Sequence, residues 1–188
     1  LPKNVDEDLA WFLGYFVGDG NVNKSGIGLT TGDNELIQKL RQLSFSLFGL
    51  QAVIKFDTSE GHHRWRINLY SREIWRFLES LGITLTDKAR AKKIPNAILR
   101  SPQPVMSAFL RGYFDADAYA GKEGIKLTSS SEELIRTVQI VLLNYGILST
   151  QRPKQDGCIN LEITSTSAAR FLDEIGFGLE RKQQALRA

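Results

Sequence analysis

The sequence contains an internal repeat, and this repeat limits the possible folds more than any other feature. When the chain is shifted by 98 positions, residues 12–37 align with 110–135 without a gap, and 12 of the 26 positions are identical. The similarity resumes where RFLESLGI at 76–83 matches RFLDEIGF at 170–177. The chain therefore holds two copies of one unit, and we expect two pseudo-symmetric halves with the same architecture.

Both copies show the same order of helix and strand signals. Residues 7–17 and 104–115 are apolar on most faces, which predicts a buried helix at the start of each half. Cap residues, alternation and Gly-containing turns predict the later elements. These are short β segments around 19–30 and 117–128, helices from Asp33 and Ser131, paired strands at 51–57 with 64–70 and 149–154 with 158–164, and final helices at 72–81 and 166–175. The order αββαββα in each half predicts an α+β fold with mostly antiparallel sheet.

The two halves are joined by a basic segment. We expect an N-terminal half at 1–87, a basic linker at 88–103 and a C-terminal half at 104–188. Residues 64–100 carry nine Lys or Arg against three Asp or Glu, which favours a nucleic-acid partner only slightly over a solvated helix.

Several classes of protein are excluded by composition. The one cysteine, Cys158, rules out an internal disulfide and a thiolate metal site. No apolar run approaches the roughly 20 residues of a membrane span, and the acidic N-terminal segment is unlike a signal peptide. We expect an intracellular protein of the cytoplasm, nucleoid or an organelle, without a membrane partner.

The repeated helices end in matching acidic residues, Asp19 and Asp117. Small residues four apart let the two helices approach backbone to backbone; they are Gly14 with Gly18, and Gly112 with Ala116. If the helices pack as a pair, the two carboxylates meet and must be neutralised by protons or metal. Oxygen ligands favour magnesium. A turn after each helix is the alternative interpretation, and repetition at one register disfavours it.

The segments FLGYFVGDG at 12–20 and LRGYFDADA at 110–118 resemble the LAGLIDADG motif, and two such motifs in one chain are similar to the single-chain members of that homing endonuclease family. The resemblance covers nearly the whole chain. It implies a monomer whose antiparallel sheets form a saddle over double-stranded DNA, with the motif helices at the interface. It also implies a staggered double-strand break in a long asymmetric target, made by Mg²⁺-dependent phosphodiester hydrolysis.

The same resemblance implies the site residues. Two or three divalent ions would be shared between the DNA phosphates and four protein ligands, namely the side chains of Asp19 and Asp117 and the carbonyls of Gly18 and Ala116. Lys92, in KKIP, is similar to a lysine that intein-housed members place near the cut phosphates, where it would offset transition-state charge. A lysine that contacts only solvent or phosphate is the alternative. Lys182 aligns with Lys88, and by symmetry it is the catalytic candidate for the other strand.

Two of the differences between the motifs bear on the chemistry of the site. Asp115 aligns with Val17, so we assign it a helix-end or capping role outside the shared chemistry. Ala118 aligns with Gly20. An alanine forced to positive φ would cost on the order of 1 kcal/mol, so we expect strain at the end of the second helix and unequal activity on the two strands.

Polar residues alternate with apolar ones in the predicted strands, and one polar face of each sheet is a candidate DNA surface. Arginine suits guanine edges or phosphate, and asparagine suits adenine, so the strand at 64–70 is suited to the major groove. The second half is less basic, which predicts different half-sites. The candidate DNA contacts are Lys24, Lys55, Arg64, Arg66, Asn68, Tyr70, Lys122, Lys126, Gln151, Arg152, Lys154, Asn160, Glu162 and Thr164.

Two other functions are compatible with this pattern. One is a DNA- or RNA-binding protein of the same fold without cleavage, such as an RNA splicing maturase or a regulator, although a pure binder has no need of both Asp19 and Asp117. The other is protein splicing. The chain has no N-terminal Cys or Ser and no C-terminal His-Asn, so a chain of intein origin would be the nuclease part alone. An intron origin stays open.

Overall fold

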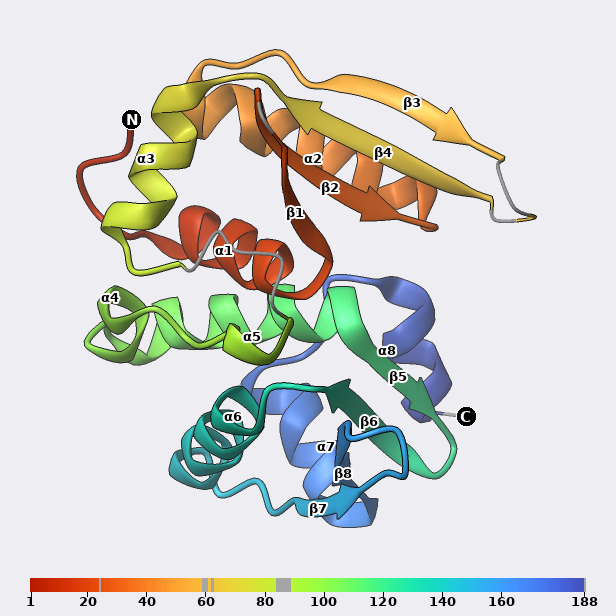
Figure 1. Cartoon of the computed structure of the whole chain (residues 1–188). Helices are drawn as coiled ribbons and strands as arrows, with labels where there is room; N and C mark the ends of the chain where they lie inside the picture. The colour runs from red at the N-terminus through yellow and green to blue at the C-terminus, as the bar shows by residue number, and fades with distance from the viewer. Residues whose placement is uncertain (24, 59–60, 62, 84–88, 188) are drawn as a thin grey trace.

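The computed structural model describes residues 1–23, 25–58, 61, 63–83 and 89–187, and it consists of two halves stacked across a central pair of helices (Figure 1). The elements of the first half are α1 (Glu7–Asp19), β1 (Gly20–Asn23), β2 (Gly26–Thr31), α2 (Asn34–Phe48), β3 (Val53–Asp57), β4 (Arg64–Leu69) and α3 (Arg72–Ser80). This order confirms the predicted αββαββα arrangement.

The second half repeats that order after a short connection. The connection holds a 3-10 turn, η2 (Ala89–Ala91), and α4 (Asn96–Leu99). The second half contains α5 (Gln103–Asp117), β5 (Ala118–Gly121), β6 (Gly124–Ser129), α6 (Glu132–Asn144), β7 (Thr150–Pro153), β8 (Ile159–Ile163), α7 (Ser165–Glu174) and α8 (Glu180–Arg187). The final helix α8 has no counterpart among the described residues that follow α3, and the sequence did not predict it.

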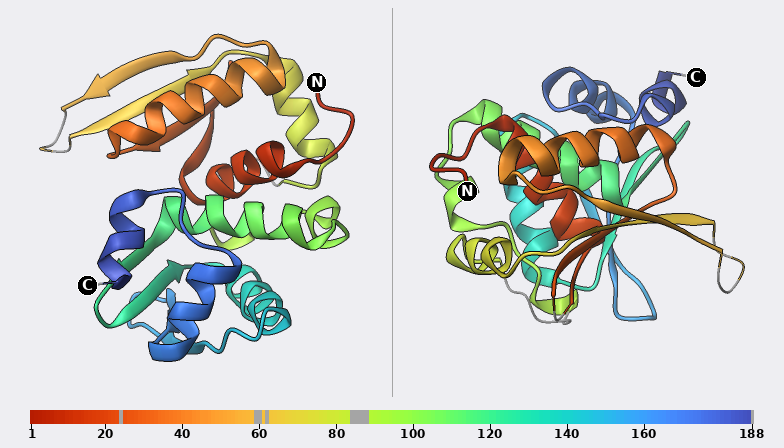
Figure 2. Two further views of the ribbon diagram at one scale, coloured as in Figure 1. Left: turned by 180° about the vertical axis from the view of Figure 1, so that it is seen from behind. Right: turned by 90° about the horizontal axis from the view of Figure 1, so that it is seen from above.

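Each half contains one four-stranded antiparallel sheet. The strand orders are β1-β2-β4-β3 and β5-β6-β8-β7, so the two sheets have the same topology. Apolar side chains on one face of each sheet, such as Ile67 and Leu161, are fully buried against the helices. The helices lie on one side of each sheet and leave the opposite side uncovered (Figure 2). The α+β class with two antiparallel sheets is confirmed.

The two motif helices, α1 and α5, lie side by side at the centre of the molecule (Figure 1). A Cβ atom on Gly14 would collide with the carbonyl oxygen of Phe109, and one on Gly112 would collide with that of Trp11. Further along, a Cβ on Gly18 would lie 2.5 Å from the Cβ of Ala116. The predicted close packing through small residues is therefore confirmed, because each helix backbone contacts the other where a side chain is absent.

The end of α5 differs from the prediction. Ala118 adopts φ −87° and ψ 141°, and Gly20 at the end of α1 adopts φ −81° and ψ 149°. Both values lie in the extended region that any residue adopts, because each helix passes directly into the first strand of its sheet. The predicted strain at Ala118 is wrong, and with it the reason for expecting unequal activity.

None of the helices in the described part of the chain is long and apolar enough to span a membrane.

We expect Gly14→Ala to destabilise the protein strongly, since the added methyl group would meet the Phe109 backbone, which cannot move without separating the helices. Overpacking of this kind costs about 1–3 kcal/mol of unfolding free energy. Gly32→Ala is the matched control, because no atom lies within 4 Å of its added Cβ. Urea denaturation measures both variants. Equal stability of the two would contradict the tight seam.

Candidate active site and nucleic-acid interface

The close packing of α1 and α5 brings their terminal carboxylates together. The position of a Cβ on Gly18 is 3.3 Å from Cγ of Asp117, so the Asp117 carboxyl group lies against the residue that precedes Asp19. Burial raises the pKa of Asp19 to about 7, and the neighbouring Asp117 adds to this effect. Burial also raises the pKa of Asp117. The two groups form one compact acidic site at the junction of the halves.

Two lysines lie next to this pair, Lys92 from the connection between the halves and Lys182 from α8. Lys92 Nζ donates to the carbonyl oxygen of Gly18 at 2.6 Å. Lys182 Nζ donates to the carbonyl oxygens of Phe114 at 2.9 Å and Asp115 at 2.7 Å. Both ammonium groups thus lie at the negative ends of the motif helices and lower the pKa of both aspartates. Burial lowers the pKa of Lys182 itself to about 8.

The donor set fits a divalent cation. It offers two carboxylates and helix-end carbonyl groups, which are the oxygen ligands that hard cations prefer. Within the described residues no cluster of three or more His, Cys, Asp or Glu side chains is present, so phosphate or water oxygens would have to complete the coordination shell. The Gly18 carbonyl, one of the predicted metal ligands, accepts a hydrogen bond from Lys92.

Asp115 has a different role from the one that the sequence suggested. It is 2% exposed and caps nothing in its own helix. Its carboxylate accepts hydrogen bonds from Trp11 Nε1 at 3.0 Å, from the backbone N–H of Gly178 at 2.9 Å and from that of Leu179 at 3.2 Å. The predicted helix-end position is confirmed, since Asp115 lies in the last turn of α5, but the capping role is wrong, because the carboxylate contacts α1 and the segment that leads into α8 and not its own helix.

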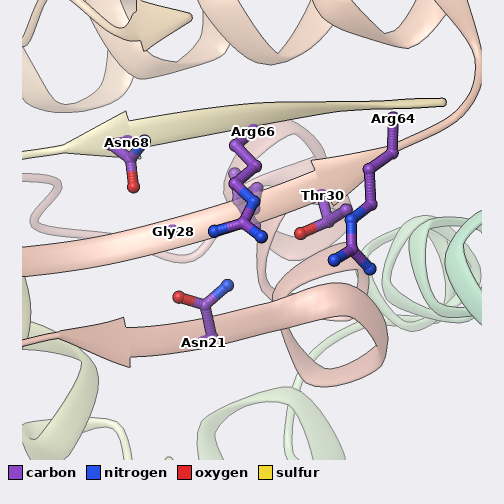
Figure 3. A pocket seen from close by; sticks show the side chains of 7 residues that line it. Asn21, Gly28, Thr30, Arg64, Arg66 and Asn68 are labelled. Carbon is purple, nitrogen blue, oxygen red and sulfur yellow. The ribbon is translucent and has the colours of Figure 1, made fainter. Parts of the chain in front are cut away.

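The uncovered face of the first sheet carries four of the predicted polar residues, Lys55, Arg64, Arg66 and Asn68. Arg66 pairs with Thr30 on one side and Lys55 on the other, and Asn68 pairs with Gly28. Side chains of Asn21, Thr30, Arg64, Arg66 and Asn68 surround a shallow pocket with Gly28 at its floor (Figure 3). The Asp57 carboxylate is 2.6 Å from Arg66 Nη2. Asn21 and Thr30 were missed from the sequence, although they stand at alternate positions of their strands.

The uncovered face of the second sheet has the same geometry and different chemistry. Glu162 lies in the middle of it, 2.7 Å from Arg152 Nε and 3.9 Å from Lys126 Nζ. Asn160 Oδ1 accepts from Thr128 Oγ1 at 2.8 Å. By register, Lys126 takes the place of Gly28, Glu162 that of Asn68, and Asn160 that of Arg66. Each face thus carries one carboxylate that pairs with two cations, Glu162 with Arg152 and Lys126 on this face and Asp57 with Arg64 and Arg66 on the first.

The remaining predicted contacts lie at the edges of these faces or elsewhere. Tyr70 follows β4 and is 52% exposed. Lys122 and Lys154 are exposed residues of turns, and Thr164 is at the N-cap of α7. Lys24 is outside the described residues. Gln151 pairs with the buried Leu161, and its Nε2 donates to Gln139 of α6, so its assignment to the DNA face is wrong because β7 turns it towards the helices.

The family follows from a match to a family model described as a LAGLIDADG-like domain, which covers residues 6–82 and 104–176. The chain belongs to this family, in its two-motif, single-chain form. Its fold is similar to that of I-DmoI in a crystal structure with DNA and Mn, with a TM-score of 0.67 and 17% identity over 92% of this chain and 98% of that chain.

Curated relatives contain the same module within longer proteins. A replication factor C small subunit of Methanocaldococcus jannaschii is 37% identical over 98% of this chain, which spans 10% of that protein. The RNA polymerase subunit Rpo1C of the same organism is 28% identical over 99% of this chain, which spans 21% of that protein. The chain thus corresponds to a tenth to a fifth of each of these relatives.

We expect the metal-free protein to lose stability as the pH rises from about 4 to 7. The folded-state pKa of Asp19, about 7, lies above its ordinary value of 3.8, so the unfolded chain releases this proton first and the unfolding free energy falls over that interval. Three pH units correspond to up to roughly 4 kcal/mol, reduced by the part of the carboxyl group that stays in water.

Thermal unfolding in EDTA between pH 5 and 8 measures this effect. Asp19→Asn is expected to flatten the profile, and Mg²⁺ at pH 8 is expected to restore stability to the original protein more than to the variant. A profile for the original protein that is already flat in EDTA would contradict the buried carboxylate pair.

Proposed function

We propose that this protein is a site-specific homing endonuclease that makes a staggered double-strand break in a long asymmetric DNA target. The observation that supports this most is the pair of pseudo-equivalent carboxylates, Asp19 and Asp117, half-buried next to each other between two lysines. The pair lies at the junction of the two sheets, so a duplex that lay along both uncovered faces would pass over it. A structural role does not account for two like charges in such a place.

The chain's own groups have separable tasks in this reaction. Asp19 and Asp117 would hold Mg²⁺, which, when bound, supplies a Lewis acid that activates water and stabilises the departing 3′ oxygen. Lys92 and Lys182 place positive charge beside the phosphates and offset the charge that develops there. The helix pair fixes the two carboxylates relative to each other and its terminal carbonyl groups hold the two lysines, so little reorganisation is needed when DNA binds.

The two sheet faces would read different half-sites. Arg64, Arg66 and Asn68 on the first face suit guanine and adenine edges in a major groove. On the second face Glu162 can accept from the amino group of cytosine, and Asn160 can recognise adenine. A palindromic target would match only one face, which supports an asymmetric target.

The module also has the distribution of an inserted element. Its relatives include a replication factor subunit and an RNA polymerase subunit, and the chain corresponds to only a small share of each. Such unrelated proteins share this segment most simply if it was inserted into both. We therefore propose that the chain is the endonuclease part of an intein and that it acts on genomic DNA inside the cell.

Asp19→Asn and Asp117→Asn should each reduce double-strand cleavage by several orders of magnitude and leave DNA affinity within a few-fold, because each removes a metal ligand and leaves the sheet faces intact. The measurement is cleavage of a target, selected from a randomised DNA library in Mg²⁺, with binding measured in Ca²⁺. Full cutting by either variant would refute the metal assignment. Undiminished DNA binding by the original protein without any cutting would favour the non-cleaving alternative.

Arg66→Ala should relax base preference within one half-site and weaken binding by about 1–3 kcal/mol. Asn160→Ala is the matched variant, since it changes the pseudo-equivalent position and should affect only the other half-site. Both are compared by selecting targets from the same library. If Arg66→Ala reduced affinity equally for all sequences, Arg66 would be a phosphate contact and not a base contact.

A further inference from the structure

The residues that begin the second helix of each half have contacts beyond their own helices. Ser131 is the N-cap of α6, and its Oγ accepts from the backbone N–H of Leu134 at 3.2 Å. The same hydroxyl group donates to the carbonyl oxygen of Lys92 at 2.6 Å. Ser131 is fully buried. A residue of the second half therefore fixes the backbone of the lysine that follows the first half.

The pseudo-equivalent residue of the first half is Asp33, 98 positions earlier and at the N-cap of α2. Its side chain makes no capping bond to its helix. Instead its two carboxylate oxygens accept from Arg181, from Nε on one side and from Nη2 at 2.7 Å on the other. Arg181 directly precedes Lys182. Nearby, the backbone N–H of Glu180 donates to Glu35 of the same first-half helix at 3.2 Å.

The two arrangements are reciprocal. The segment that carries each lysine is anchored at a helix N-cap, Ser131 for Lys92 and Asp33 for Lys182. In each case the ammonium group of that lysine binds the end of the motif helix in the half opposite to the N-cap. Lys92 returns to Gly18 in α1, and Lys182 returns to Asp115 in α5. The segment with Lys182 is held a second time by the Asp115 carboxylate, through Gly178 and Leu179, and α8 packs beside β5 at the junction (Figure 1).

This reciprocity is absent from the alignment of the repeats. Lys182 aligns with Lys88, not with Lys92, and Asp33 and Ser131 differ in type. Different contacts, an ion pair in one case and a hydroxyl-to-carbonyl bond in the other, therefore produce the same outcome at both helix ends. Two unrelated solutions at pseudo-equivalent positions indicate that the position of each lysine matters.

We propose that Asp33 and Ser131 are positioning residues that act across the interface between the halves, Asp33 through Arg181 on Lys182 and Ser131 on Lys92. Each half thereby places the active-site lysine of the other. The catalytic consequence rests on the proposed endonuclease function, whereas the anchoring itself does not.

Hydrogen–deuterium exchange on the metal-free, DNA-free protein tests the anchoring. Asp33→Ser introduces the residue type of the opposite half and removes the ion pair, so amide exchange should accelerate in 178–187 and stay unchanged in 89–93. Ser131→Ala should do the reverse. Ser131→Thr keeps the hydroxyl group and Arg181→Lys keeps the cation, so these controls should show smaller changes. Unchanged exchange in the expected segment, or equal acceleration in both, would overturn the proposal.

Single-turnover cleavage with enzyme in excess tests the consequence. Misplacement of a reacting group by about 1 Å can cost up to roughly a hundredfold in rate, so each anchor variant should cut roughly ten- to a hundredfold more slowly with DNA affinity in Ca²⁺ unchanged. The loss caused by Ser131→Ala should vanish in a Lys92→Met background and persist in a Lys182→Met background. Asp33→Ser should show the opposite dependence.

A purely structural role gives a different result, since each anchor variant would then slow cleavage equally in both lysine backgrounds. That outcome would reject the positioning role. If the original protein cut no DNA at all, the proposed function would fail, and the exchange experiment would still decide whether the anchors hold the two segments.

Discussion

The contact between the backbones of α1 and α5 is the constraint on which the rest of the structure depends. Gly14 and Gly112 each admit a carbonyl oxygen of the other helix at the place where a side chain would be. The same close packing brings the C-terminal ends of both helices, with Asp19 and Asp117, next to each other. The helix contact that joins the halves therefore also forms the acidic site.

That geometry has an energetic cost, and the surrounding groups offset part of it. Two half-buried carboxylates at the negative ends of two helices are unfavourable, because the like charges repel each other and the helix dipoles disfavour negative charge there. The ammonium groups of Lys92 and Lys182 lower the pKa of both aspartates, but burial outweighs them and the pKa of Asp19 stays near 7. The site thus favours a further cation, which is the property that a metal-dependent enzyme of phosphate esters requires.

The repeat allowed the sequence to predict the architecture, the helix pair and the meeting of Asp19 with Asp117. Prediction from the repeat failed where the copies diverge. Asp115 aligns with Val17 of the other copy, and only the structure shows that the segment before α8 contacts its carboxylate. The helix α8 itself buries one residue, Lys182, so it has no apolar stripe from which a period could be recognised.

Alternation along a strand predicts which residues share a face but not which face is uncovered. Arg64, Arg66 and Asn68 were placed correctly because two neighbours, Ile67 and Leu69, are large and apolar. Gln151 was not, since its strand β7 is short, lies at an edge and has no comparable apolar residue. Alternation therefore identifies the uncovered face of a strand only where large apolar residues mark the buried face.

The two copies are similar in the core and differ on the uncovered faces of their sheets. Many positions that are identical in both copies, such as Tyr15 with Tyr113 and Leu29 with Leu127, are buried in the core. The uncovered faces differ between the copies. The second copy has Lys126 at the position equivalent to Gly28 and Glu162 at the position equivalent to Asn68. Packing tolerates few substitutions in a close-packed interior, whereas the solvent side of a strand tolerates many. A duplicated scaffold can therefore acquire two different recognition surfaces while the helix pair beneath them keeps the geometry of a single active site.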